Sequence, residues 1–491
     1  MTANRSTFRS ISLLRKLTTM AVLALIALGL VASIASASSR EVEIVSKGEA
    51  PANVPKHVHY FKTIQAAVDA TKRGAWVLIE PGVYEEEVKV TKPHAGIFIR
   101  GMDRNSVIVD GQNKIVPGGR NGIEIFKDNN VWVENLTVRN FEREAINGPG
   151  GNEIWWNGGA ESKKIGAHGW YGRYLTAYDT GLNGGYGIFT DNEIEGEWEH
   201  IYASGFNDSG IYLGACPECK ARIDDATMEY NALGYSGSNS GGNLIIENSV
   251  FKHNTTGIAP NSENPGDGPP PQNGACEHVR PYKGPHSKLP EFTSTEFAHC
   301  TIIRDNLITE NSDLNVPANT SAAAAPWGAG IELPGDYGDL IEHNTITNNP
   351  SDGVLAFEYP NPFPVEEDTI LFQNAGNEVA NNTFSGNGYL GGTFSGDVAF
   401  EGGLFGNAST NNCLTGNSFA DATYPANIEG EWGCQNKTTP NPGGGFPFIE
   451  YILQLQAESE GRPEIEPVGP PPAQPTMPNP CENVPTNPLC P

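Results

Sequence analysis

The densest group of side chains that could bind a ligand or react with it lies in residues 152–191. Aromatic rings occur there beside cations. This combination suits a carbohydrate, because rings pack on sugars and cations hold uronate carboxylates. We therefore predict that the group contacts a polysaccharide, although a well-packed insertion covering the edge of the fold would explain the same residues. The predicted substrate-binding residues are Trp155, Trp156, Trp170, Tyr171, Tyr174, Lys163 and Lys164.

Acidic residues in and beside this group could supply catalysis. Two carboxylates on neighbouring strands can act as general acid and base. Carboxylates also bind calcium, which is the one cofactor that this group suggests. A solvated acidic surface is the alternative explanation. The predicted catalytic residues are Asp179, Asp191, Asp208, Arg173 and His168.

The elements that must position these residues follow a repeat. Gly precedes a β-prone residue at Gly187, Gly210, Gly234 and Gly257, in steps of 23, 24 and 23 residues. Gly330 and Gly353, and also Gly122 and Ala145, are again 23 residues apart. A steady period means stacked units that bury their apolar faces only against one another. Leucine-rich and helical repeats lack their signatures here, so we predict an all-β fold, a parallel β-helix.

Asparagines follow the same period. Asn207, Asn231 and Asn254 each stand three residues before a repeat Gly. Stacked coils would place them in one column, where side-chain amides hydrogen-bond to one another. A second column is predicted from residues that precede strands, namely Asn135, Asn248, Asn344, Asn382 and Asn417. We interpret both columns as structural ladders rather than ligand-binding or glycosylation sites.

Other segments interrupt or cap the repeat. Residues 147–186, 259–298 and 312–328 break the spacing, and insertions in solenoids form loops that often line the binding face. Residues 61–70 predict a short capping helix with Thr63 as N-cap. Residues 463–491 are rich in proline and predict an extended tail.

The N-terminus is typical of a secretion signal. Basic residues precede an apolar run over residues 20–32, and residues 35–37 fit a small-residue cleavage site. The run is shorter than the roughly 20 residues that a membrane span needs. We therefore expect a secreted, cell-surface or periplasmic protein with no membrane span in the mature chain. The predicted organisation is a signal peptide at 1–37, a β-helix domain at 41–435 and a Pro-rich tail at 436–491.

All eight cysteines follow the predicted signal, and an even number in an exported chain predicts disulfides. Cys216 and Cys219 could instead form half a zinc site or a redox pair. The simplest pairing joins neighbours, because each bond then closes a short loop: Cys216–Cys219, Cys276–Cys300, Cys413–Cys434 and Cys481–Cys490.

The charge balance excludes one class of partner. The chain has 58 acidic and 31 basic residues and a formal charge of −27. Such a surface repels phosphate backbones, so we expect no nucleic-acid partner. An acidic polysaccharide would need a local basic group or bridging calcium to offset this charge.

The opening of the repeat resembles a known superfamily. Residues 63–69 (TIQAAVD), 81–84 (PGVY) and 97–101 (IFIRG) resemble the cap and first coil of pectin-lyase-like right-handed parallel β-helices, pectinesterases included. Residues 185–214 resemble exported bacterial parallel β-helix repeat proteins without an assigned reaction. The resemblance covers about residues 60–435 and implies a right-handed parallel β-helix with a short N-terminal capping helix. The catalytic motifs of pectinesterases, polygalacturonases and pectate lyases are not matched, so no catalytic residue is carried over.

Two functional hypotheses follow. In the first, the protein binds and processes a polysaccharide, with a uronate-containing chain favoured, by lyase, epimerase or hydrolase chemistry. In the alternative, it is a non-catalytic cell-surface or matrix protein that recognises a glycan, as the tail and the missing motifs favour. Metal handling ranks third, because only Met102, Met228 and Met477 follow the signal, and copper delivery favours Met-rich sites.

Overall fold

The computed structural model describes residues 40–91, 93–145, 148–159, 165–263, 269–273, 299–313, 326–360, 371–401, 409–437, 441, 448–459 and 468–491. The predicted signal peptide at 1–37 lies outside these residues, and so do Lys163, Lys164 and Cys276. In the described part of the chain, no helix is both long enough and apolar enough to cross a membrane.

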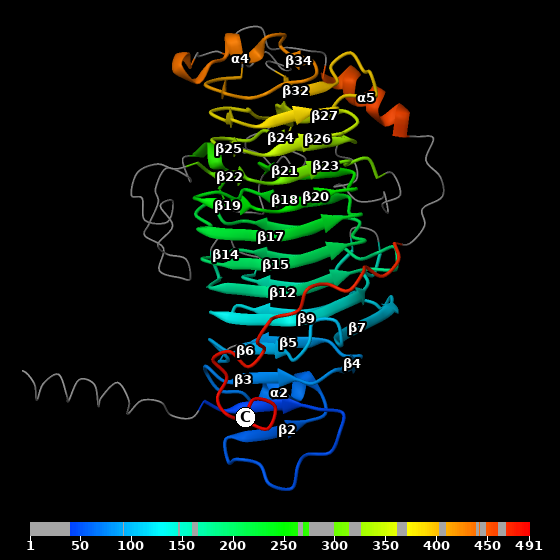
Figure 1. Ribbon diagram of the computed structural model, residues 1–491, viewed down its shortest axis with the longest axis vertical. Helices are drawn as coiled ribbons and strands as arrows, with labels where there is room; N and C mark the ends of the chain where they lie inside the picture. The colour runs from blue at the N-terminus through cyan, green and yellow to red at the C-terminus, as the bar shows by residue number, and fades with distance from the viewer. Residues whose placement is uncertain are drawn as a thin grey trace, which may run out of the picture.

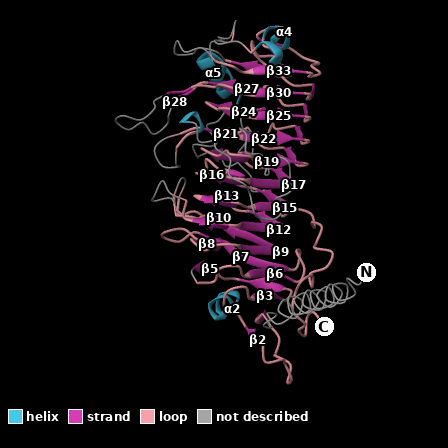
Figure 2. Ribbon diagram, turned by 90° about the vertical axis from the view of Figure 1, so that its left-hand side faces the viewer, coloured by secondary structure: helices cyan, strands magenta, loops and turns pink. Residues whose placement is uncertain are grey.

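The chain forms a right-handed parallel β-helix, as the repeat and the resemblance predicted (Figure 1). Two sheets, which we call sheet A and sheet B, lie on opposite sides of one core (Figure 2). Sheet B contains eleven strands: β5 (Val88–Thr91), β8 (Asn121–Phe126), β10 (Asn152–Asn157), β13 (Tyr186–Asp191), β16 (Ser209–Gly214), β18 (Leu233–Ser238), β21 (Thr256–Asn261), β24 (Ala329–Pro334), β27 (Asp352–Phe357), β32 (Gly396–Phe400) and β34 (Thr423–Tyr424).

Sheet A contains nineteen strands: β1 (Val42–Val45), β2 (Val58–Phe61), β3 (Trp76–Ile79), β4 (Gly82–Tyr84), β6 (Phe98–Gly101), β7 (Val107–Lys114), β9 (Val131–Phe141), β12 (Trp170–Tyr178), β15 (Glu197–Ser204), β17 (Ala221–Glu229), β19 (Leu244–Glu247), β20 (Val250–Lys252), β22 (Thr301–Arg304), β23 (Leu307–Thr309), β25 (Leu340–Glu342), β26 (Thr345–Thr347), β30 (Glu378–Ala380), β31 (Thr383–Ser385) and β33 (Cys413–Thr415). From β9 onward, each coil bends within sheet A at one residue, which we call the corner residue. It has positive φ, as at Tyr174 (53°), His200 (53°) and Asp225 (51°).

The repeat glycines are explained by the distance between coils. A Cβ built on Gly187 would lie 2.5 Å from the carbonyl oxygen of Gly210, and one on Gly234 would lie 2.4 Å from that of Gly257. At these positions a side chain would clash with the neighbouring coil, so glycine is favoured there. The next residue points inward, and its column of Ile188, Ile211, Tyr235 and Ile258 is fully buried. The period therefore marks the core of the stack.

The register corrects one step of the repeat. Ile123 pairs with Ile154 and not with the residue after Ala145, so Glu153 occupies the Gly position of that coil. Residues 147–186, predicted as an insertion between coils, therefore contain the strands β10 and β12 of a complete coil. The extra residue length lies instead in the turns around those strands.

Two asparagine ladders run along the coils, but three of the predicted members stand outside them. Asn231, Asn254, Asn311, Asn349 and Asn387 form one ladder, in which each Nδ2 donates to the next Oδ1 over 3.0–3.1 Å. Asn306, Asn344, Asn382 and Asn417 form a second. Asn135 and Asn248 are corner residues, one position earlier. Asn207 stands outside the first ladder, because its coil places Phe206 at that position, where the Phe206 amide donates to Asn231 Oδ1.

The helices cap the sheets at both ends. Helix α2 (Ile64–Ala70) covers the first coil, and Thr63 Oγ1 accepts the Ala66 amide at 3.2 Å as its N-cap. Helix α5 (Phe448–Ser459) lies on the outer face of sheet B near the other end, where Tyr451 and Leu455 pack on Leu355 (Figure 2). The helix α4 (Ile428–Glu431) lies at the top of the stack in Figure 1.

Three of the predicted disulfides are present: Cys216–Cys219, Cys413–Cys434 and Cys481–Cys490. The bond between Cys216 and Cys219 leaves no thiolate to ligate zinc there, whereas a redox pair would form the same bond in its oxidised state. The pair Cys276–Cys300 stays a prediction, because Cys276 lies outside the described residues.

The Pro-rich tail folds back along the solenoid. Residues 468–491, which we call the strap, cross the outer face of sheet A and end beside β2 (Figure 1, red). Arg100 Nη1 donates to Pro480 O and Glu482 O at 2.9 and 2.8 Å, and Asn135 Oδ1 accepts Met477 N at 2.8 Å. The strap therefore belongs to the folded body and limits how much of sheet A is open.

Candidate functional site

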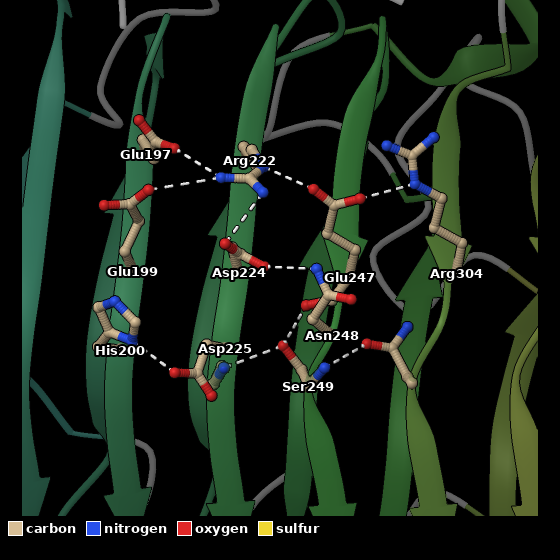
Figure 3. A network of polar contacts seen from close by, with 12 residues as sticks. Glu197, Glu199, His200, Arg222, Asp224, Asp225, Glu247, Asn248, Ser249 and Arg304 are labelled. Carbon is tan, nitrogen blue, oxygen red and sulfur yellow. Dashed lines mark hydrogen bonds and ion pairs between the residues drawn. The ribbon is translucent and has the colours of Figure 1, made fainter. Parts of the chain in front are cut away.

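The outer face of sheet A gathers acids, a histidine and aromatic rings on three adjacent strands. Alternation in β15 points Glu197 and Glu199 outward and buries Trp198 between them in the core. His200 follows at the corner, and Asp225 is the corner residue of the next coil (Figure 3). Strand β12 adds Tyr171, Arg173 and Tyr174 on the other side.

Arg222 is the hub of this face (Figure 3). Its Nη1 lies 3.1 Å from Glu197 Oε1 and 3.4 Å from Glu199 Oε1, and its Nη2 lies 2.9 Å from Asp224 Oδ2. Its Nε lies 2.6 Å from Glu247 Oε1, whose other oxygen pairs with Arg304 Nε at 2.7 Å. Four carboxyl groups share two guanidinium groups, so the cluster keeps an excess of negative charge.

The excess charge and burial keep a proton on Glu197. Burial is the main reason why the pKa of Glu197 rises to about 8, the charge of Glu199 adds to it, and Arg222 opposes it. At neutral pH the group is a carboxylic acid that hydrogen-bonds to Glu199. Strand β15 thus carries a neutral proton donor beside a carboxylate.

His200 and Asp225 form a histidine–carboxylate pair across two coils. His200 Nδ1 hydrogen-bonds to Asp225 Oδ2 (Figure 3), so Nε2 is the ring nitrogen that remains available to a ligand. The His200 side chain is 40% exposed, which leaves the ring accessible. The hydrogen bond to Asp225 orients the imidazole ring, as a general base requires.

Tyr174 stacks on His200 with 4.4 Å between the ring centroids. Burial raises the pKa of Tyr174, the charges of Glu199 and Asp225 add to this, and Arg173 opposes it. Arg173 in turn hydrogen-bonds to the buried Glu134 and lies 3.8 Å from Glu482 of the strap. These side chains therefore act on one another electrostatically and form one site at the edge of the strap.

A second column repeats the ring stack and the histidine–carboxylate contact. Tyr230 stacks on His253 with 5.4 Å between ring centroids, and His253 Nε2 lies 3.8 Å from Glu310 Oε2. Tyr230 also lines a cavity of about 450 Å³ between the body and the strap. No counterpart of Glu197 or Arg222 is joined to this column by a described hydrogen bond or ion pair, so it lacks the proton donor.

The predicted aromatic group is split between two sheets. Trp155 points outward on sheet B, where it stacks on Phe189 with 5.1 Å between centroids and donates Nε1–H to Asp191 Oδ1 at 2.9 Å. Tyr171, Arg173 and Tyr174 lie on sheet A, on the opposite side of the core. The structure therefore does not bring these predicted contact residues together on one surface.

Two predicted sugar contacts are core residues. Trp156 and Trp170 are fully buried and pack against Trp198 with centroid distances of 5.9 and 4.5 Å. Tyr171 is also mostly covered, at 5% exposed, and stacks on Trp132. Strand alternation sends Trp156 and Trp170 inward, so neither can contact a polysaccharide.

Two predicted catalytic aspartates, Asp179 and Asp208, stabilise turns of the coil. Asp179 is 1% exposed and accepts the amides of Gly181 and Gly184 at 3.0 and 2.9 Å. Asp208 pairs with Arg143 at 3.3 Å. Asp179 and Asp208 are thus buried and stabilise turns. His168 is exposed on the short strand β11 (Ala167–His168), where its amide donates to Asn129 Oδ1, and in the part of the chain that the structure describes it forms no hydrogen bond with His200 or Asp225.

The predicted acids are not assembled for calcium. In the described part of the chain, the one group of three potential ligands within 4.8 Å of one another is Glu378 with Cys413 and Cys434, and those sulfurs form a disulfide. Asp179, Asp191 and Asp208 each contact different partners. The residues do not fit a preformed calcium site.

Sequence reasoning missed Glu197, Glu199, Arg222 and the pairing of His200 with Asp225. The signal was present, since Glu197-Trp-Glu199-His200 alternates polar and apolar residues within a coil. Arg222-Ile223-Asp224-Asp225 alternates in the same way one coil later. Two such runs at the same offset in successive coils predict an outward polar patch.

Two sequence comparisons match parts of the chain. A family model described as a protein of unknown function (DUF1565) matches residues 315–441. Pectinesterase 1 of Citrus sinensis is 40% identical over 62 residues, which cover 12% of this chain and 11% of that protein, so the match spans about a tenth of that relative.

Solved β-helical structures also match at low identity. The A-module of the Azotobacter vinelandii mannuronan C-5 epimerase AlgE6 is 14% identical, with a TM-score of 0.42, over 72% of this chain and 90% of that one. A tailspike protein of the E. coli bacteriophage HK620, in complex with a pentasaccharide, is 13% identical, with a TM-score of 0.45, over 71% of this chain and 55% of that one.

Proposed function

Since this chain is a pectin-lyase-like right-handed β-helix, we propose that it binds a uronate-containing polysaccharide across sheet A and processes it by removing the C5 proton. The observation that carries the proposal is the pairing of a solvent-accessible base, His200 with Asp225, and a neutral acid, Glu197, on one face. Lyase and epimerase chemistry both begin with this proton transfer.

The roles follow from the geometry. His200 Nε2 accepts the C5 proton, and Asp225 stabilises the imidazolium that forms. For a lyase, the electron pair left at C5 forms the C4–C5 double bond, the C4–O bond breaks, and the leaving oxygen takes a proton from an acid of the site. For an epimerase, a proton returns to C5 from the opposite side. Glu197, on the same face as His200, is the neutral acid available to protonate the leaving oxygen of the lyase step, whereas the epimerase step needs a donor on the other side of the sugar.

The spacing of the carboxyl groups argues against hydrolysis. A glycoside hydrolase needs its two carboxyl groups about 5–9.5 Å apart, so that the scissile bond or a water fits between them. Glu197 and Glu199 hydrogen-bond directly to each other. They therefore act as one proton-sharing unit instead of flanking a glycosidic bond.

Product analysis tests the proposal. The mature protein is incubated in deuterated water with polygalacturonate, polymannuronate and a neutral glucan as control. Unsaturated chain ends that absorb in the ultraviolet identify a lyase, and deuterium at C5 without cleavage identifies an epimerase. Binding without either product would overturn the catalytic proposal and favour the recognition protein. Saturated fragments would show hydrolysis and would also contradict it.

A further inference from the structure

We propose that a hollow near the N-terminal end of sheet A binds the carboxylate of a uronate residue, as a second contact for an acidic polysaccharide. The hollow lies beside the first coils and has a volume of about 290 Å³, at the lower end of ligand sites. It extends the proposed function, but it depends on different residues and is tested by binding alone.

Two arginines give the hollow its charge. Arg40 and Arg73 both line it and are exposed, and neither has an ion-pair partner among the residues that the structure describes. Glu41, next to Arg40, is already paired with Lys72 Nζ at 2.7 Å. In a chain with a net charge of −27, two uncompensated guanidinium groups on one hollow favour an anion that both can hydrogen-bond.

The floor of the hollow leaves room for a ligand. Gly74 and Gly96 form part of it, with φ of 76° and 75°. A Cβ placed on Gly74 would meet nothing within 4 Å. The backbone conformation favours glycine, and the missing side chains keep the space above the turn open.

The wall consists of stacked rings. Phe98 and Trp132 line the hollow and stack with 5.7 Å between centroids, and Trp132 stacks on Tyr171 at 4.4 Å. Because neighbours in the stack cover the ring faces, the ring edges are what a ligand meets. Aromatic edges carry partial positive charge, so this wall supports an anion.

The same row of rings leads to the proposed catalytic face. Phe98 pairs in register with Trp132, Trp132 with Tyr171, and Tyr171 with Glu197, which makes three steps between adjacent strands. At about 4.8 Å a step this is roughly 14 Å. A monosaccharide cannot contact both places, whereas an oligosaccharide lying along the row can. The ligand is therefore an oligomer with a charged sugar at the hollow.

Calorimetric titration with hexagalacturonate tests the inference, and its methyl-esterified form is the matched uncharged ligand. We expect the double variant Arg40→Gln/Arg73→Gln to bind the acidic hexamer at least tenfold more weakly than the wild type. Gly74→Asn fills the hollow without changing charge, and asparagine tolerates positive φ. It should weaken binding similarly. Lys114→Gln removes one positive charge from an exposed site elsewhere and should change affinity less than twofold.

Several results would overturn the inference. These are equal affinity of the double variant and the wild type, equal loss in Lys114→Gln, equal binding of the esterified hexamer, and no binding of the acidic hexamer at all. Thermal unfolding of each variant checks that it is folded. Turnover of the hexamer by the wild type is measured separately, so that binding at the hollow and the proposed reaction can fail independently. Arginine-dependent binding without any turnover by the wild type would retain this site and reject the proposed reaction.

Discussion

The rings of Tyr174 and His200 stack on successive coils with 4.4 Å between centroids, and both residues have a backbone φ of 53°. This left-handed conformation costs roughly 1–2 kcal/mol for a residue with a Cβ. Asn135 and Asn248 occupy the same corner in other coils, where their short polar side chains suit it better. Strained backbone positions cluster at functional sites. A bulky tyrosine and a histidine at this corner, next to Asp225, therefore indicate a functional role in addition to packing.

Replacing His200 tests the base directly. We expect His200→Gln to lower the turnover rate by about 10²- to 10⁴-fold while substrate affinity is retained, because only the proton acceptor is lost. The matched control is His253→Gln. It alters the corresponding ring stack of the second column, in which Tyr230 packs on His253. Steady-state kinetics on the polysaccharide that is turned over provide the measurement. Equal losses in both variants would assign His200 a structural role.

The pH dependence of turnover tests the acid. Glu197 must be protonated to act, and its pKa lies at about 8, so kcat/KM should fall as the pH rises through about 8. Glu199 raises that pKa, so Glu199→Gln should move the alkaline limb to lower pH. Glu342→Gln, in the same outward row but four coils away from Glu199 on sheet A, should leave the limb in place. An unmoved limb in Glu199→Gln would exclude Glu197 as the acid.

The burial of Glu142 in the turn beside sheet B should make the stability of the protein depend on pH. Burial, with the charge of Asp179, raises the pKa of Glu142 to about 7. The folded protein therefore binds this proton more tightly than the unfolded chain, and the stability that it contributes is lost as the pH rises from about 4.5 to about 7. Glu142→Gln removes the effect. We expect it to melt a few degrees above the wild type at pH 8, with a smaller difference at pH 5.

Calorimetry at the two pH values provides the comparison. Glu85→Gln, at an exposed position, is the control and should not change the pH dependence. A Glu142→Gln variant that is less stable than the wild type at pH 8 would show that the carboxylate is needed for the Asn183 amide, which it accepts at 2.9 Å.

The strap depends on a buried ion pair. Arg100 Nε lies 2.7 Å from Glu134 Oε2, both side chains are almost completely buried, and Arg100 also donates to two strap carbonyls. Arg100→Gln leaves the Glu134 charge with less compensation and should cost about 3–5 kcal/mol. Hydrogen exchange should then rise across residues 468–491. Lys437→Gln breaks an exposed pair with Glu378 and should cost below about 1 kcal/mol. Unchanged exchange in the strap would contradict this role for Arg100.

The asparagine ladder should behave as one hydrogen-bonded unit. Asn311 accepts from Asn254 and donates to Asn349 and to Phe251 O. Asn311→Ala leaves buried groups without partners and should cost about 3 kcal/mol in unfolding free energy. Asn248→Gly, at an exposed corner with positive φ, should cost much less. Denaturant unfolding compares the two. Similar costs would show that the ladder adds little to stability.

The sequence predicted the fold because stacked coils impose the same packing requirement once per coil, which leaves a repeat in the sequence. A Cβ does not fit where two coils touch, so glycines such as Gly187 and Gly210 recur at the coil length, and the following isoleucines form the core column. Three disulfides were predictable for a similar reason, since each joins cysteines that are close in sequence.

The site could not be predicted to the same extent, because the face on which a side chain lies depends on the phase of each strand. Tyr174 occupies a corner, so both it and Arg173 point outward and the alternation shifts by one residue before the buried Leu175. The same phase sends Trp156 and Trp170 into the core. The sequence determined the coil, its core and the chemistry of its residues. Only the tertiary structure decided that His200 meets Asp225, 25 residues later, since inter-strand hydrogen bonding fixes which positions of successive coils face one another.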